Sequence, residues 1–90
     1  MKKLPIKCPS CEQALIVSQL SCTNCETHIS GKYPLPTLLQ LSLEEQEFVF
    51  EFLLSSGSLK SMASKLNKSY PTVRNKLDDI IEKVNQLNTI

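Results

Sequence analysis

The chain has 90 residues and a mass of 10.1 kDa, which is enough for one ordinary domain or two very small ones. Apolar residues make up 41% and charged residues 21% of it, as in globular proteins, so a disordered tail is excluded. The longest apolar run, residues 14–17, is far shorter than the ~20 residues of a membrane helix. No secretory signal and no Gly-rich phosphate loop are evident, and the chain has one His. We therefore expect a cytoplasmic protein that is not an enzyme.

The charges are arranged in blocks, although the net charge is only +1. Residues 1–33 carry four Lys and two Glu, net +2, and residues 34–57 carry four Glu and no base, net −4. Residues 58–77 carry four Lys, one Arg and no acid, net +5, and residues 78–90 carry three acids and one Lys, net −2. The small net charge therefore hides a cationic segment, residues 58–77, that lies between two acidic segments.

The first predicted element is a metal site. The four cysteines form two C-x-x-C pairs, and the expected ligands are Cys8, Cys11, Cys22 and Cys25. In a cytosolic chain such pairs favour a metal over disulfides, because two tight turns direct four thiolates to one point and hold structural Zn²⁺ tetrahedrally. With β-forming residues between the pairs and after them, this layout predicts a zinc ribbon. A segment of about 33 residues buries too little apolar surface to fold alone, so the metal would supply folding free energy.

Other interpretations of the cysteines remain open. Iron in a rubredoxin-like site uses the same four thiolates, but rubredoxins pack aromatic residues around the iron and this segment has only Tyr33. Two disulfides or a reactive dithiol are further alternatives. His28 follows Cys25 by three residues, and we expect it to be a surface or strand residue because four thiolates complete the shell. Glu12 and Glu26 follow the pairs where Gly is common, so a positive φ there would be strained.

A proline-marked linker, residues 34–36, ends the predicted ribbon. Residues 37–40 have the spacing of a capping box and predict one short helical turn. The stronger helix start is at Ser42, which is expected as the N-cap with Glu45 at the third helical position.

The helix over residues 43–55 is apolar over roughly 240° of its surface, whereas one core needs little more than ~100°. This excess predicts either a central helix that contacts both the ribbon and the other helices, or a subunit contact through Phe50 and Leu54.

Two further helices follow, separated by a tight turn. Ser58 is expected to cap the first, whose apolar positions recur with helical spacing at Leu59, Met62, Ala63 and Leu66. Asn67 suits a left-handed turn, Ser69 caps the next helix, and Pro71 falls in its first turn. A helix, a three-residue turn and a longer basic helix have the spacing of a helix-turn-helix.

The exposed start of the last helix predicts a nucleic-acid interface. Its candidate base-reading residues are Tyr70, Thr72, Arg74 and Asn75, because Arg and Asn match guanine and adenine edges. The candidate phosphate contacts are Lys60, Lys65, Lys68 and Lys76. Asp78 and Asp79 follow one turn later and would repel phosphates, so we expect weak binding by a monomer.

The chain resembles a family of short bacterial and archaeal proteins of unknown function that join an N-terminal zinc ribbon to a C-terminal helix-turn-helix. The resemblance covers almost the whole chain. It rests on Cys8-Pro-Ser-Cys11, Cys22-Thr-Asn-Cys25, the run from Gly31 to Pro36 and, most specifically, the run from Ser69 to Asp78. The helix-turn-helix is also similar to that of sigma-factor region 4. The family is regarded as regulating transcription, which the resemblance therefore implies here.

These observations predict a small α+β protein with a zinc ribbon at residues 1–33, a linker at 34–36 and an all-α helix-turn-helix domain at 37–90. The expected function is zinc-containing, double-stranded DNA-binding transcriptional regulation. The first alternative is an adaptor that docks on a protein of the transcription machinery without reading DNA, and the second is an iron or redox-active thiolate protein. A homodimer is also predicted, because Val73, Leu77, Ile80, Val84 and Leu87 have heptad spacing. The alternative is that the end of this helix packs back onto Phe48 and Phe52 within one chain. No membrane partner is expected.

Overall fold

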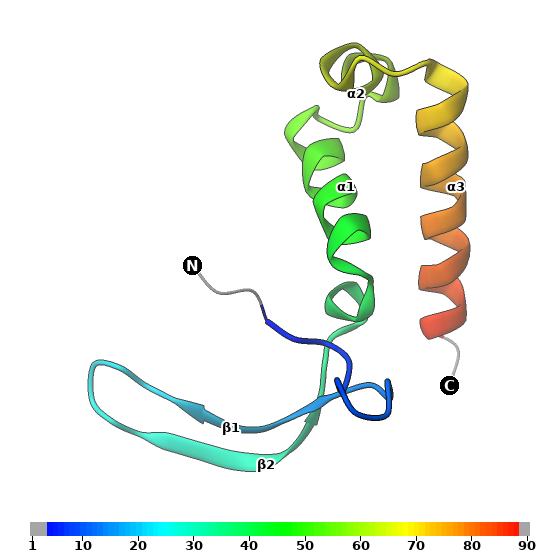
Figure 1. The fold of residues 1–90 in the computed structure, drawn as a ribbon. Helices are drawn as coiled ribbons and strands as arrows, with labels where there is room; N and C mark the ends of the chain where they lie inside the picture. The colour runs from blue at the N-terminus through cyan, green and yellow to red at the C-terminus, as the bar shows by residue number, and fades with distance from the viewer. Residues whose placement is uncertain (1–3, 89–90) are drawn as a thin grey trace. The chain divides into compact units, whose positions relative to one another are not determined.

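The computed structural model describes residues 4–88, which divide into two compact units between Gln40 and Leu41 (Figure 1). The N-terminal unit contains two strands and a short 3-10 helix, and the C-terminal unit contains three α-helices. The predicted small α+β fold is confirmed. Residues 1–3 and 89–90 of the expected domains lie outside the described residues.

The division between the units falls four residues beyond the expected linker. The 3-10 helix η1, Thr37–Gln40, lies on the N-terminal side of it, whereas the sequence assigned these residues to the helical domain. The Gln40 side chain explains this placement, because its Nε2 donates a hydrogen bond of 2.6 Å to the carbonyl oxygen of Leu35.

The ribbon is a two-stranded antiparallel sheet formed by β1, Ile16–Ser21, and β2, His28–Pro34. The pairing register shifts by one residue between Val17 and Gln19, which indicates a β-bulge. Gly31 lies on the opposite strand at this point, and a Cβ there would approach a ring carbon of Tyr33 to 2.8 Å. The absence of a side chain at Gly31 therefore allows the tyrosine ring to lie close to the backbone.

The N-terminal unit has almost no apolar core. Every residue of β2 is exposed, and Leu35 is the one buried apolar side chain in its described part. The sheet therefore gains little stability from apolar burial, since an isolated two-stranded hairpin is marginally stable at best.

The three helices begin where the sequence predicts, each on a serine N-cap. They are α1, Leu43–Leu54, α2, Leu59–Leu66, and α3, Tyr70–Leu87. The Ser42 hydroxyl accepts from the Glu45 N–H, and the Glu45 carboxylate accepts from the Ser42 N–H at 2.8 Å, so the capping box is complete. Asn67 adopts the left-handed conformation, with φ +56°, that the sharp turn between α2 and α3 requires.

One apolar cluster joins the three helices. Its buried members are Leu41, Phe48, Leu59, Met62, Ala63, Val73 and Ile80. Met62 of α2 and Val73 of α3 are 0% and 1% exposed, so the two helices of the predicted helix-turn-helix are fixed through fully buried side chains. No helix within residues 4–88 is long and apolar enough to span a bilayer.

The heptad-spaced face of α3 packs against the core of its own chain, and the homodimer stays a prediction. Leu77, Val84 and Leu87 pack against the buried cluster. The reason is that this face of α3 completes the apolar core that α1 and α2 form together. On α1 the expected spare surface is present, because Phe50 and Leu54 are 61% and 58% exposed. A subunit contact through this surface stays a prediction.

The packing predicts the effect of core truncation. Met62→Ala removes the fully buried side chain between the helices and should lower the free energy of unfolding by about 2–5 kcal/mol, the usual cost of such a cavity. Leu54→Ala on the exposed side of α1 is the control and should change it by about 0.5 kcal/mol or less. Thermal and urea unfolding, followed by helical circular dichroism, measure both. Equal losses would show that the exposed surface of α1 is covered in solution.

Candidate functional site

The first cysteine pair lies in a tight backbone turn. The Cys8 N–H donates to the carbonyl oxygen of Gln13 at 2.8 Å, and the Glu12 N–H donates back to that of Cys8 at 2.8 Å. The Ser10 N–H points at the Cys8 sulfur from 3.4 Å. Backbone N–H groups directed at a sulfur favour its thiolate form, which is the form that binds metals.

The second pair lies in a turn of the same geometry. The Cys22 N–H donates to the carbonyl oxygen of Thr27 at 2.8 Å, and the Glu26 N–H donates to that of Cys22 at 2.9 Å. The Thr27 hydroxyl lies 2.9 Å from the Cys25 sulfur. Both turns therefore place a glutamate one residue after the second cysteine, and the backbone reverses at that glutamate.

The two glutamates are held in the left-handed region. Glu12 has φ +63° and Glu26 has φ +62°, as expected if these positions favour Gly. A non-Gly residue in this region costs roughly 1–2 kcal/mol, so each turn carries some backbone strain.

One thiol of each pair has a lowered pKa. The backbone N–H of Cys11, followed by that of Ser10, lowers the pKa of Cys8. The Thr27 hydroxyl, followed by the Thr27 backbone N–H, lowers the pKa of Cys25. Both shifts favour the deprotonated sulfur, so the turns are suited to metal binding before any metal arrives.

Each cysteine pair lies in its own turn, and the four side chains do not come together in the structure. Among the described residues, no three His, Cys, Asp or Glu side chains come together as a set that could hold a metal ion. A tetrahedral four-sulfur site therefore requires the two turns to approach each other. His28 is at the start of β2, where its Nδ1 lies 2.8 Å from the Ser21 hydroxyl, so this nitrogen contacts the neighbouring strand.

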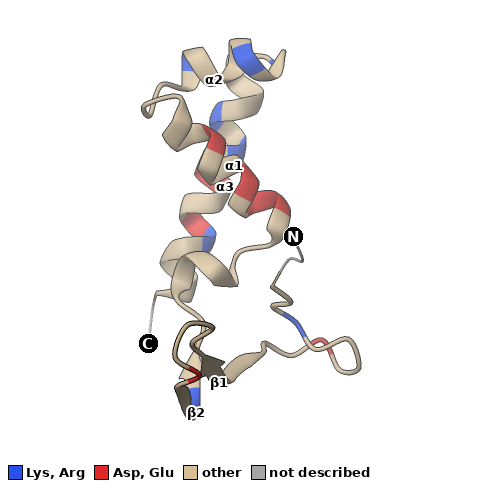
Figure 2. Ribbon diagram, turned by 90° about the vertical axis from the view of Figure 1, so that its left-hand side faces the viewer, with Lys and Arg blue, Asp and Glu red and all other residues tan. Residues whose placement is uncertain are grey.

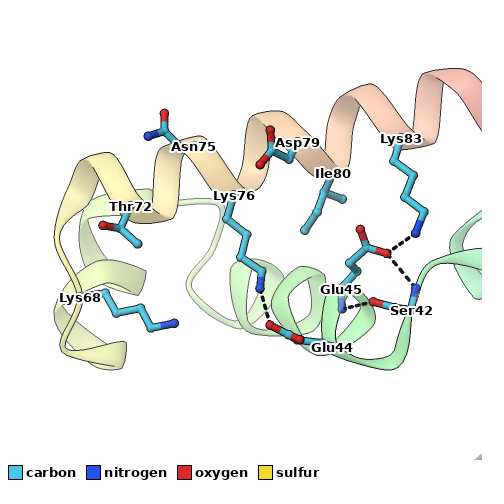
Figure 3. Close-up of a pocket in the computed structure, with 10 residues that line it drawn as sticks. All are labelled: Ser42, Glu44, Glu45, Lys68, Thr72, Asn75, Lys76, Asp79, Ile80 and Lys83. Carbon is cyan, nitrogen blue, oxygen red and sulfur yellow. Dashed lines mark hydrogen bonds and ion pairs between the residues drawn. The ribbon is translucent and has the colours of Figure 1, made fainter.

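The candidate base-reading residues lie together on the first two turns of α3, and all are exposed. Thr72 is also part of the helix start, because its hydroxyl lies 2.7 Å from that of the Ser69 N-cap. Arg74 lies 3.5 Å from Asp78, measured from Nε to Oδ2, in an ion pair one helical turn apart. Figure 3 shows Asn75 pointing away from α1. The structure thus presents these side chains to solvent, and their role stays a prediction.

Two of the four candidate phosphate lysines are paired with α1. Lys76 Nζ lies 2.7 Å from Glu44 Oε1, and Lys65 Nζ lies 2.9 Å from Glu51 Oε2. That Glu51 oxygen is buried, and the Lys65 ammonium is the cation that balances its charge. Figure 2 shows the acidic positions on α1 and the basic positions on α2 and the start of α3.

The other two candidate lysines, Lys60 and Lys68, form no ion pair within residues 4–88. Lys68 is nevertheless near α1. The hydrogen bond from Lys76 lowers the pKa of Glu44 most, and the positive charge of Lys68 contributes to the same shift. The available positive charge of the +5 block is therefore concentrated at α2 and at the turn that precedes α3.

A groove separates the start of α1 from α3 (Figure 3). Its charged lining residues balance one another, and they are Glu44, Glu45, Lys68, Lys76, Asp79 and Lys83. Lys83 Nζ lies 2.7 Å from Glu45 Oε1, the same oxygen that accepts from the Ser42 N–H. Two ion pairs, Lys76–Glu44 and Lys83–Glu45, therefore link α1 to α3 beside the groove, and its lining carries no net charge.

Sequence reasoning missed the acidic partners of the basic block. The signal was present in the −4 block of residues 34–57, which directly precedes the +5 block of residues 58–77. Oppositely charged helices that pack together pair their side chains. The individual pairs could not be assigned, because the Lys76 and Glu44 positions are 32 residues apart in the sequence.

Two comparisons found nothing, since no curated protein and no solved structure matches the chain. Two family models do match, one described as a DUF2089 zinc ribbon, over residues 8–39, and one described as "Domain of unknown function (DUF2089)-HTH", over residues 41–87. The zinc-ribbon match includes both cysteine turns, and the helix-turn-helix match includes all three α-helices. The resemblance stated from the sequence is confirmed, and the chain belongs to the DUF2089 family, with an N-terminal zinc ribbon and a C-terminal helix-turn-helix.

Proposed function

We propose that this protein is a zinc-containing, double-stranded DNA-binding regulator of transcription. The observation that carries the proposal is the exposed start of α3, which follows α2 after a tight turn and shares with it a buried core that includes Met62 and Val73. In a helix-turn-helix this part of the second helix enters the major groove and contacts base edges. Lys60 and Lys68 then contact phosphates, while Lys65 and Lys76 must first exchange their glutamate partners.

The zinc ion is proposed to be held by Cys8, Cys11, Cys22 and Cys25. The fit rests on the donor set and on the two turns of equal geometry, each with one thiol of lowered pKa. When bound, zinc supplies a tetrahedral link between the turns and folding free energy for a ribbon that has little core. A site closed by four thiolates has no open coordination position, so its role is structural.

An adaptor role is the second candidate, and the exposed apolar surface of α1 favours it. Phe50, Leu53 and Leu54 are 61%, 68% and 58% exposed, which is more than single scattered apolar residues. Folded protein that is not retained on duplex DNA at low salt would favour this function over DNA reading.

Elemental analysis tests the metal. The purified chain should carry zinc at a ratio of about one per chain, and Cys22→Ser should release it because three thiolates hold the ion weakly. The helical circular dichroism of residues 41–88 should survive, since their core contains no cysteine. A protein without metal, or one coloured by iron–thiolate absorption, would contradict the proposal.

The strained glutamates predict a second effect on the metal site. Glu26→Gly removes the side chain that disfavours φ +62° and should tighten zinc retention by roughly fivefold, equivalent to about 1 kcal/mol. Glu26→Ala is the matched control, because it removes the same charge but keeps a Cβ. Competition with a chromophoric chelator measures both variants. Equal tightening would show that the charge, and not the backbone, limits affinity.

The ion pairs predict that the lysines contribute unequally to DNA binding. Lys68→Ala should weaken binding to a 20-base-pair duplex for all sequences and reduce the salt slope by about 1. Lys76→Ala should cost less, because Lys76 is already neutralised by Glu44 and binding would have to break that pair. Fluorescence anisotropy at several salt concentrations gives both slopes. If the two variants lose the same affinity, the Lys76–Glu44 pair opens at no cost on binding.

A further inference from the structure

The side chains of Arg74 and Asp78 form an ion pair on the exposed side of α3. They are 53% and 52% exposed, and they are separated by one helical turn. From the sequence alone, Asp78 was expected only to repel phosphates. In the structure its carboxylate instead faces the guanidinium that is the best candidate for reading guanine.

The nitrogen that Asp78 contacts decides what Arg74 can still do. The pair is formed by Nε of Arg74 and Oδ2 of Asp78 at 3.5 Å. Within the described part of the chain no acid other than Asp78 forms an ion pair with Arg74. The two terminal nitrogens, Nη1 and Nη2, form the planar fork that donates two parallel hydrogen bonds to O6 and N7 of a guanine.

A carboxylate at Nε has two consequences for that fork. It limits the rotamers of the Arg74 side chain, so that less conformational entropy is lost when Arg74 binds a base. It also balances the positive charge, so Arg74 is attracted less to phosphates at other positions. Both effects raise the affinity for one base relative to the affinity for any duplex.

We propose that Asp78 is a positioning residue that sets the base specificity of Arg74 by holding its Nε and leaving the terminal fork free for guanine. This inference rests on the proposed DNA-binding function and adds a specificity determinant to it.

Asp79 provides a matched comparison. It carries the same charge and is the next residue of α3, but it lines the groove beside Lys76 and Lys83 and makes no ion pair with Arg74 (Figure 3). Simple repulsion of phosphates predicts the same gain in affinity when either aspartate is neutralised. A positioning role predicts a loss of base preference for Asp78 alone.

The experiment selects binding sites from a 20-base-pair duplex library with a randomised centre, using the full chain loaded with zinc. The wild type should select a guanine at one position, and Arg74→Ala should lose that preference by roughly 5- to 150-fold. Asp78→Asn should lose part of it, roughly threefold or more, while Asp79→Asn keeps it. Asp78→Glu should restore it, because the longer carboxylate still reaches an arginine one turn away.

The remaining measurements make the outcome decisive. Thermal unfolding checks that each variant is folded, and Asp78→Ser replaces Asp78→Asn if that variant is not. Equal affinity gains for Asp78→Asn and Asp79→Asn on all sequences, with the guanine preference intact, would overturn the positioning role. DNA binding without any preference that depends on Arg74 would also overturn it, while leaving the DNA-binding function standing. No retention of the wild type on duplex DNA at low salt would overturn both.

Discussion

The helical unit depends on one shared core, to which α2 contributes the fully buried Met62 and α3 contributes the fully buried Val73. This packing requires a sharp reversal between the helices, which Asn67 provides by adopting the left-handed conformation. It also fixes the position of the first turns of α3, since Val73 is one residue before Arg74. The buried core therefore also fixes the positions from which the exposed side chains on the first turns of α3 project.

Charge pairing then decides which basic side chains are available. The acids of α1 neutralise Lys65, Lys76 and Lys83 across the helix packing. Ion pairs at a surface contribute little to stability, about 0–1 kcal/mol each, so their main effect here is on the electrostatic field. They reduce the general attraction for phosphates over much of the +5 block. The proposed DNA binding would therefore depend more on base contacts, and less on bulk charge, than the sequence indicates.

The local features were predictable because they depend on short sequence patterns. Ser42, Ser58 and Ser69 begin the helices as expected, because a hydroxyl before an apolar periodic run satisfies free N–H groups. The left-handed conformation of Asn67 and the strain at Glu12 and Glu26 follow from the same local rules. The non-local features were not predictable in this way. The use of Val84 inside the chain and the Lys76–Glu44 pair depend on which helix faces meet, and periodicity alone does not specify that.

The groups that cap the three helices determine which part of the helical unit responds to low pH. The caps of α2 and α3 are hydroxyls whose protonation does not change with pH, so these two starts are indifferent to acid. The start of α1 differs, because the Glu45 carboxylate accepts from both Ser42 and Lys83, and Glu44 holds Lys76. The pKa of Glu44 is lowered, chiefly by Lys76, so the stability from this pair is present above the ordinary Glu pKa of 4.5 and is lost as the pH falls through the lowered value. Acidification therefore removes the ion pairing between the start of α1 and α3, while the hydroxyl caps of α2 and α3 are unchanged.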